Sequence, residues 1–226
     1  MSDFPLSNPA QMLAIYSGLC GLLYVETDGF RRDLPVLNAI PILSLAILTL
    51  TLRMKTPAKQ FTALSFCAFA IGVYLHTSEW RNNLQFTCAV FTIAQALYAL
   101  SFIGYVQRMW HGCAIAVTVY LIAFLYFCFA DMIRSIPTLV ISLSVNLIVA
   151  AVSLIAAGSV WLYGSKGVNA QQAALLRFLG LLLFMLLTSL KALNLFGKQF
   201  DKSNYLCSVL FYIAQPLMFF ANERAF

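Results

Sequence analysis

Charge is what this sequence has least of. Fourteen Lys and Arg and eight Asp and Glu make up 10% of the 226 residues, where soluble domains carry about 25% charged residues. Hydrophobic residues reach 62%, and the mean hydropathy is +0.85. A compact globule of this size has too little interior to bury that much apolar surface. The composition excludes a soluble domain and predicts an integral membrane protein.

The few charges are confined to short stretches, which leaves eight charge-free runs. Seven of the eight runs have at least 19 residues, and a helix needs roughly 20 apolar residues to cross the hydrocarbon core. The exception is 178–190, where Arg177 and Lys191 can snorkel from the helix ends to the headgroups and extend the span. We therefore expect an all-α polytopic membrane protein with eight transmembrane helices. The runs are 4–25, 34–52, 60–78, 82–107, 109–130, 135–165, 178–190 and 203–222.

Other absences narrow the class of function. The alternating polarity of β-barrel strands is missing, and no cleavable signal peptide is expected, because Asp3 precedes the first run without any Lys or Arg. The six cysteines lie within the apolar runs without a CxxC pair, which favours packing roles. Phosphate loops, zinc spacings and a clustered basic face are also missing. We therefore expect no cofactor, no metal and no nucleic acid, and a membrane lipid as the partner.

A short motif occurs twice and indicates an internal repeat. Residues 91–97 (FTIAQAL) and 211–217 (FYIAQPL) are identical at five of seven positions, at an offset of 120. A weaker match at an offset of 115 pairs Leu64 and Phe69 with Leu179 and Phe184. The matched helices are four crossings apart and run in the same direction. One transmembrane domain, residues 1–226, is thus predicted to contain parallel halves, 1–107 and 108–226, of four helices each.

Polar residues inside the runs are the candidates for chemistry. Ionisable groups within a membrane mark functional sites by default, but all eight acidic residues lie at or beyond the ends of the runs. Among the neutral groups, Gln95 and Gln215 are the leading site candidates, because the repeat places both near its axis, whereas Asn146 is expected to bond between helices. His76 and Glu79 share a helix face three residues apart. They are either an acid–base pair or an ordinary pair at the membrane interface.

Several stretches together resemble one known family. They are Pro41 in the second predicted helix, Ala94–Tyr98 in the fourth, Leu182–Phe184 leading to Asn194 and Phe196 in the seventh, and Phe211–Gln215 in the eighth. With the chain length and the eight-helix layout, they are similar to the lysoplasmalogenase (YhhN-like) membrane proteins over most of the chain. The resemblance implies hydrolysis of the vinyl-ether bond of lysoplasmalogen to a fatty aldehyde and a glycerophospholipid, and a location in the endoplasmic reticulum.

The family's chemistry needs one carboxyl that protonates the enol-ether carbon and one that stabilises the oxocarbenium ion. The resemblance aligns the positions of these two acids with Val73 and Thr188. It aligns a basic residue of the second helix with Asn38 and a histidine of the fourth with Gln95. Each departure removes an ionisable group. The residues expected to line the lipid pocket are Asn38, Val73, Gln95, Tyr98, Thr188, Asn194 and Gln215.

Three functions remain open at this point. The first is hydrolysis of lysoplasmalogen, in impaired form or with a relocated acid, for which His76 and Glu79 are the candidates. The second is a non-catalytic relative that binds a lysolipid, or a partner's helices, in the same pocket. A transporter ranks third, because Pro41 and Pro216 interrupt helices at positions that do not correspond in the two halves.

The loops on the two sides carry similar Lys and Arg totals, so charge assigns no orientation, and the sequence gives no oligomeric state.

Overall fold

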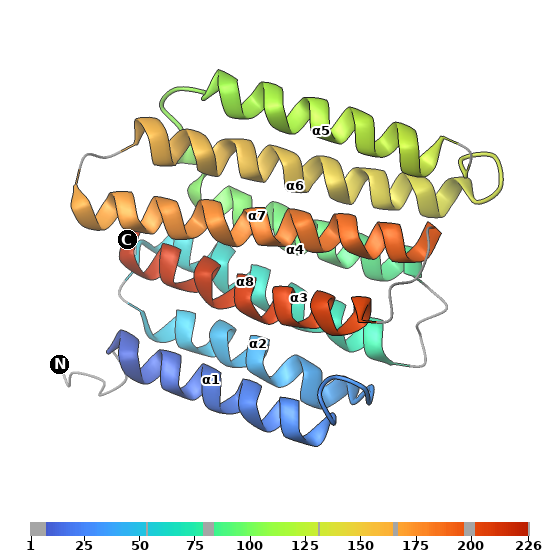
Figure 1. Cartoon of the computed structure of the whole chain (residues 1–226). Helices are drawn as coiled ribbons and strands as arrows, with labels where there is room; N and C mark the ends of the chain where they lie inside the picture. The colour runs from blue at the N-terminus through green and yellow to red at the C-terminus, as the bar shows by residue number, and fades with distance from the viewer. Residues whose placement is uncertain are drawn as a thin grey trace.

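The computed structural model describes residues 8–52, 54–78, 84–130, 132–164, 167–196 and 202–225. These residues form eight α-helices, one 3₁₀ turn and no strand. Figure 1 shows the helices lying side by side with alternating directions. The all-α prediction is confirmed. The helices are α1 (Pro9–Glu26), α2 (Pro35–Thr51), α3 (Thr56–Thr77), α4 (Leu84–Phe102), α5 (His111–Phe129), α6 (Pro137–Tyr163), α7 (Val168–Phe196) and α8 (Ser203–Ala225), with the 3₁₀ turn η2 (Ile103–Tyr105) after α4.

Most of these helices have the length and composition of membrane spans. Within the described ranges, six qualify: α3, α4 with its 3₁₀ extension, α5, α6, α7 and α8. α2 is apolar but shorter, with 17 residues, and α1 has 18. The protein is a multi-pass integral membrane protein.

Prolines define where several helices begin. α1, α2, α3 and α6 each carry a proline in the first turn, namely Pro9, Pro35, Pro57 and Pro137. Proline suits this position because its backbone angle is already helical and its missing N–H would have no partner there. The helix starts are therefore encoded locally, by residues next to the ends of the charge-free runs.

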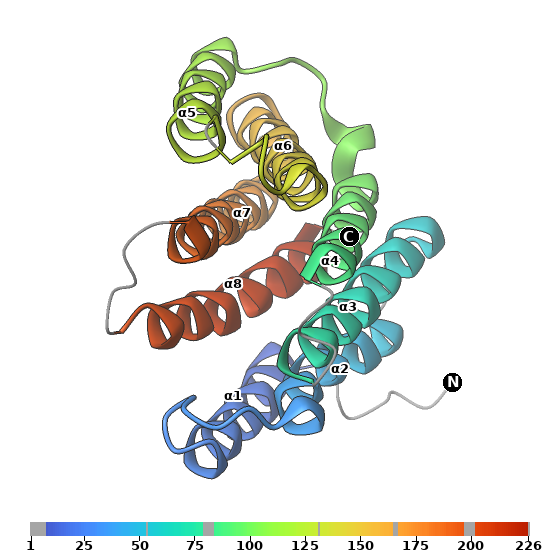
Figure 2. The ribbon, with the colours of Figure 1, turned by 90° about the vertical axis from the view of Figure 1, so that its right-hand side faces the viewer.

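Six helices form a closed ring and two lie outside it. In order around the ring, α2 packs on α3, α3 on α4, α4 on α6, α6 on α7, α7 on α8, and α8 contacts α2 again. Figure 2 views this ring from one end. α1 lies outside against α2 and α8, and α5 lies outside against α6 and α7. The predicted halves, 1–107 and 108–226, contribute α2–α3–α4 and α6–α7–α8 to the ring in the same order, and the internal repeat stays a prediction.

A proline inside α8 explains how α1 is attached. Pro216 has no N–H, so the carbonyl of Tyr212 four residues earlier loses its helical partner. The hydroxyl of Tyr16 in α1 donates to that carbonyl at 2.7 Å. The Tyr212 hydroxyl in turn donates to the carbonyl of Asn38 in α2 at 2.9 Å. In lipid such a carbonyl has no water to bind, so the proline creates a docking point for α1.

The seventh helix differs from its prediction. It spans 29 residues instead of the short run 178–190, and Arg177 lies in its interior with 2% of its surface exposed. The expectation that Arg177 snorkels to the headgroups is wrong. Its Nη2 donates to Asn222 Oδ1 at 2.8 Å, and its guanidinium lies 4.6 Å from the centre of the Phe102 ring. The charge of Arg177 ends the predicted charge-free run 178–190 on its N-terminal side. The helix nevertheless continues past Arg177, because the guanidinium has partners inside the ring.

Asn222 connects this arginine to two further helices. Its Nδ2 donates to Thr62 Oγ1 in α3 at 2.8 Å and to Ser101 Oγ in α4 at 3.2 Å. One amide thus joins α3, α4, α7 and α8, because Arg177 is on α7 and Asn222 is on α8. Removal of Asn222 would therefore leave groups on three other helices without these hydrogen bonds.

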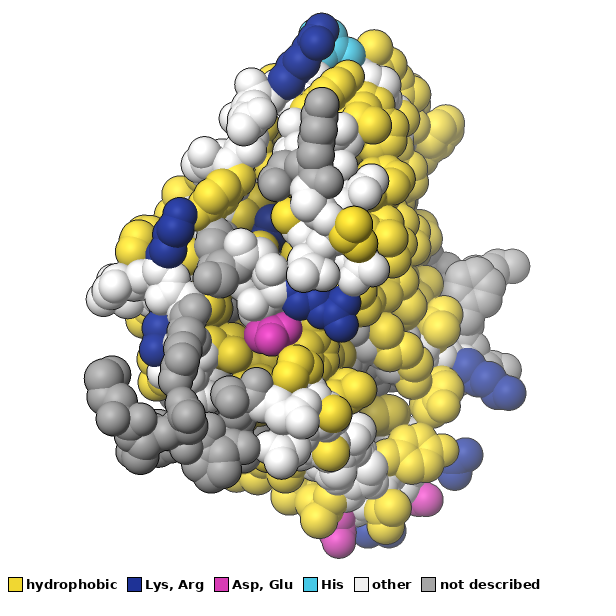
Figure 3. Space-filling model, turned by 90° about the vertical axis from the view of Figure 1, so that its left-hand side faces the viewer, with side chains coloured by type: hydrophobic (Ala, Val, Ile, Leu, Met, Phe, Trp, Pro, Cys, Tyr) yellow, Lys and Arg dark blue, Asp and Glu magenta, His cyan; other side chains and the backbone are white. Residues whose placement is uncertain are grey.

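The network lies towards the end of the bundle that Figure 3 views. There, Lys and Arg side chains are scattered around an apolar body, and an acidic side chain lies next to basic ones. Lys59 at the start of α3 donates from Nζ to the Leu52 carbonyl at 3.0 Å. Basic groups at the rim of an apolar body are typical of side chains at headgroup level.

We predict that Asn222→Leu destabilises the protein by about 2–4 kcal/mol, because it removes an acceptor from a buried guanidinium and a donor from two hydroxyls. The measurement is the thermal unfolding of the detergent-purified protein. Asn204→Leu, at an exposed position at the other end of α8, is the control and leaves the midpoint unchanged. Equal midpoints for the two variants would contradict the network's role.

Candidate functional site

A cavity of about 470 Å³ lies inside the ring. All six ring helices and the α1–α2 connection contribute to its wall. The contributions come from the C-terminal halves of α3 and α7 and from the N-terminal halves of α2, α4, α6 and α8. These halves meet at the same end of the bundle, the one that faces the viewer in Figure 2. The volume lies within the range of roughly 300–1,000 Å³ that is typical of ligand sites.

The floor of the cavity is aromatic. Phe91, Phe184 and Phe211 line it, from α4, α7 and α8. Phe69 of α3 packs against them, with its ring centre 5.3 Å from that of Phe184 and 6.4 Å from that of Phe211. The Phe91 and Phe211 rings lie edge to face at 6.2 Å, an arrangement that stabilises aromatic pairs. The cavity therefore ends on an apolar surface within the bundle.

The two positions where the family resemblance placed acids lie in this cavity. Val73 on α3 and Thr188 on α7 both line it, and so do Asn38 and Asn194. Thr188 is fixed by a hydrogen bond from its Oγ1 to the Phe184 carbonyl at 2.9 Å. Neither position 73 nor 188 carries an ionisable group, so the acid chemistry expected of the family has no carboxyl at these points.

Three of the predicted pocket residues do not line this cavity. Gln95, Tyr98 and Gln215 are fully buried. Gln95 lies one turn beyond Phe91 and Gln215 one turn beyond Phe211, so the phenylalanine floor separates both from the cavity. The structure places all three inside the ring but not in the wall of this cavity, and their role in a lipid pocket stays a prediction. Glu79 lies outside the described residues.

Lys191 is the main site residue that the sequence did not predict. The expectation that it reaches for the headgroups is wrong, because it lines the cavity, with its Nζ 5.3 Å from the centre of the Phe91 ring. Its ammonium makes no hydrogen bond or ion pair within the described residues. The thiols of Cys88 and Cys207 line the same cavity. The sequence spacing could have predicted this position, because Lys191 is three residues after Thr188 and so lies on the same face of the helix.

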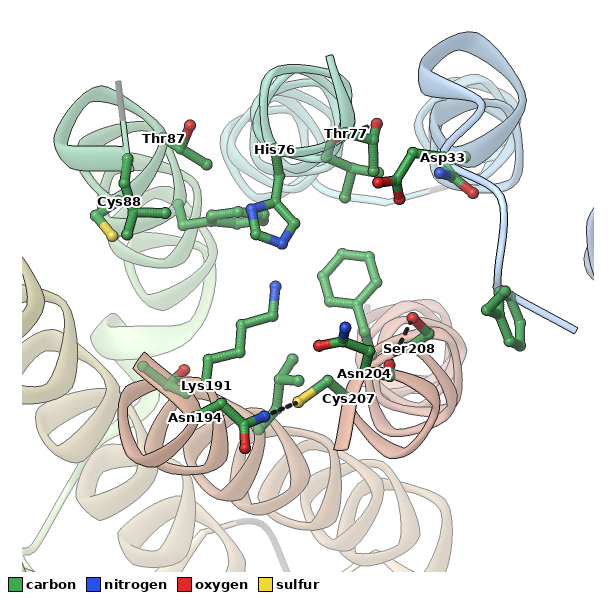
Figure 4. A pocket seen from close by; sticks show the side chains of 18 of the residues that line it. Asp33, His76, Thr77, Thr87, Cys88, Lys191, Asn194, Asn204, Cys207 and Ser208 are labelled. Atoms are coloured by element: carbon green, nitrogen blue, oxygen red, sulfur yellow. Dashed lines mark hydrogen bonds between the residues drawn. The ribbon is translucent and has the colours of Figure 1, made fainter. Parts of the chain in front are cut away.

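His76 lies opposite Lys191. Figure 4 shows the two side chains, from α3 and α7, pointing into the same space. The offset of 115 that matches Val73 with Thr188 also matches His76 with Lys191. His76 and Lys191 thus occupy corresponding positions at this offset, and both line the cavity three residues after Val73 and Thr188.

The α1–α2 connection forms part of the cavity mouth. Its Phe30, Arg31, Arg32 and Asp33 line the opening, and the Phe30 ring stacks on Tyr212 at 5.6 Å. Asp28, Gly29 and Phe30 have φ values of 51°, 69° and 62°, a left-handed run that turns the chain back over the ring. Asp33 is the one carboxylate that the described residues bring to the cavity, against two arginines, Lys191 and His76. No group of three His, Cys, Asp or Glu side chains in the described ranges is arranged to hold a metal.

We predict that the cavity is open to water as far as Thr188 and closed beyond Phe184. In a variant whose six native cysteines are replaced, Thr188→Cys should react rapidly with a small anionic thiosulfonate reagent. Leu181→Cys, seven residues deeper on the same helix and fully buried, should react far more slowly. The measurement is the rate of modification by mass spectrometry. Equal rates at the two positions would show that the aromatic floor is not a barrier.

Comparison with known proteins gives one match. The sequence model of the YhhN family matches residues 35–222, from the first turn of α2 to the last turn of α8. The matched region contains all six ring helices and the cavity wall except for the α1–α2 connection. No curated protein and no solved structure matches the chain.

Proposed function

The chain belongs to the YhhN family, and from this premise we propose that its central cavity binds a lysophospholipid of the lysoplasmalogen class. One observation carries the proposal: positions 73 and 188 share a cavity that has an apolar floor and basic side chains above it. A lysophospholipid matches the two parts of this cavity, because it has one apolar chain and one anionic phosphate. The chain would lie against the phenylalanines and the phosphate near Lys191.

The charge of the cavity favours an anionic headgroup. Lys191 and His76 face its interior, and Arg31 and Arg32 lie at its mouth, where Asp33 is the only described acid. An ammonium and a phosphate form a charge-assisted hydrogen bond, which is stronger than a neutral one. The bound phosphate would also supply the partner that Lys191 lacks among the described residues.

The same charge disfavours vinyl-ether hydrolysis. That reaction passes through an oxocarbenium ion, which a nearby carboxylate stabilises and a nearby ammonium destabilises. Val73 and Thr188 offer no carboxylate, and Lys191 is one turn from Thr188. Binding without turnover is therefore the function that the charges of this site support best.

We predict that Lys191→Met weakens binding of a lysophospholipid by about 10- to 100-fold, the effect of losing one charge-assisted hydrogen bond. The measurement is a titration followed by thermal stabilisation of the detergent-purified protein. Lys202→Met makes the same change at an exposed position outside the cavity and should bind like the wild type. Failure of any lysophospholipid to stabilise the wild type would overturn the proposed function.

Hydrolysis of lysoplasmalogen is the second candidate, favoured by the presence of His76 and Asp33 in one cavity. A protonated His76 would donate its proton to the enol-ether carbon, and the Asp33 carboxylate would offset the charge that develops. Water would then add to the cation and lose a proton to His76, and the resulting hemiacetal would break its bond to the glycerol oxygen, giving the aldehyde and a glycerophospholipid with a free hydroxyl.

This candidate predicts aldehyde release from lysoplasmalogen by the purified protein and its loss in His76→Ala. His111→Ala is the matched control, because His111 is exposed at the opposite end of the bundle and binds the Met109 carbonyl. Release no greater than that of heat-denatured protein would leave only the binding function.

A further inference from the structure

Tyr212 is the residue at which three segments of the chain attach to α8. Its hydroxyl donates to the Asn38 carbonyl of α2 at 2.9 Å, and its own carbonyl accepts from the Tyr16 hydroxyl of α1 at 2.7 Å. Its ring stacks on Phe30 of the α1–α2 connection, with ring centres 5.6 Å apart and planes inclined by 13°. α1, the connection and α2 are therefore all held by one residue, which also lines the cavity.

These contacts lie at the least extensive junction of the ring. α2 and α8 pack together less extensively than any other neighbouring pair of ring helices, and α1 covers their junction from outside by contacting both. Asn38 and Tyr212 line the cavity from the two sides of this junction, so the hydrogen bond between them closes its wall. A separation of α2 from α8 at this point would open the cavity sideways to the lipid.

The connection is held in a conformation that its residues do not favour. Asp28, Gly29 and Phe30 all have positive φ, and a bulky residue such as Phe is rare in the left-handed region because its Cβ crowds the backbone. Such conformations persist only where surrounding contacts hold them, and they cluster at ligand clamps and switch regions. For Phe30 these contacts are the stack on Tyr212 and an edge-to-face contact with Tyr24 at 5.6 Å.

The charges at the mouth favour a different route for ligands that carry a long apolar chain. Arg31, Arg32 and Asp33 line the mouth, and an apolar chain that passed between them would remove water from charged groups, which is costly. Between α2 and α8 the chain would move from lipid to the phenylalanine floor without leaving apolar surroundings. Small water-soluble molecules meet no such cost at the mouth.

We infer that ligands with a long apolar chain enter the cavity between α2 and α8, and that Tyr212 holds α1 and the connection over this entrance. The structure shows the closed arrangement. In the open one, the Tyr212 hydroxyl leaves the Asn38 carbonyl and the Phe30 ring leaves the Tyr212 ring. The inference goes beyond the proposed function, because it concerns the route into the cavity and applies to any ligand with such a chain.

The test compares the rates at which a cysteine in the cavity reacts with N-methylmaleimide and with N-dodecylmaleimide, which differ only in chain length. The protein carries Thr188→Cys after replacement of its six native cysteines and is held in phosphatidylcholine nanodiscs. Tyr212→Phe keeps the ring but removes the hydrogen bond to Asn38. It should raise the rate with the dodecyl reagent about fivefold, the effect of one hydrogen bond on the opening equilibrium. The rate with the methyl reagent should not change.

Two further variants separate the entrance between the helices from the mouth. Tyr16→Phe removes the hydrogen bond that attaches α1. Tyr16 does not line the cavity, so a faster reaction with the dodecyl reagent in this variant cannot come from a wider mouth. Tyr98→Phe is the matched control, because it removes the same group from a fully buried tyrosine that donates to the Met218 carbonyl of α8 at 2.9 Å outside the cavity wall. Both of its rates should equal those of the parent protein.

A faster dodecyl reaction in both Tyr212→Phe and Tyr16→Phe, with Tyr98→Phe unchanged, would support the entrance between α2 and α8. An unchanged dodecyl rate in either variant would overturn the inference. An equal rise with the methyl reagent, or an equal rise in Tyr98→Phe, would also overturn it, because it would show a general loosening of the ring. None of these outcomes depends on binding of a lysophospholipid, so failure of this inference is distinguishable from failure of the proposed function.

Discussion

The structure depends on one constraint, which is that a polar group carried into lipid must find its partner inside the protein. The ring of six helices is the solution that this chain adopts. Arg177 binds Asn222, and Asn222 binds Thr62 and Ser101, so four helices share one polar cluster. The Tyr16 hydroxyl satisfies a carbonyl left open by Pro216 and so attaches α1. These contacts create helix packing where lipid provides no hydrophobic driving force between helices.

The same constraint explains why the side chains of the cavity indicate its function. Asn222 and Tyr212 have their partners inside the bundle, whereas Lys191 lines the cavity without a hydrogen bond or ion pair among the described residues. A basic side chain that faces a ligand-sized space is typical of a binding site. The cavity of this YhhN family member thus differs in chemistry from a dry packing defect.

Much of this could be predicted from the pattern of residues. The charge-free runs predicted eight helices, and first-turn prolines such as Pro35 and Pro137 place their starts. The family resemblance singled out positions 73 and 188, which share the cavity. The failures have a common cause. Lys191 and Arg177 were assigned to the headgroups because a sequence gives the position of a charge but not the direction of its side chain.

The sequence by itself determined that this is a multi-pass helical membrane protein, because too few charges are present for water and their spacing leaves runs of membrane length. It also determined the family, through an apolar frame that extends over residues 35–222. Only the tertiary structure decided which faces of the helices meet. A rotation of a few tens of degrees moves a side chain from lipid to cavity, and that rotation is set by packing between helices far apart in sequence. For this reason the low charge of the chain identified its solvent, while only the structure shows that Lys191 lines the cavity.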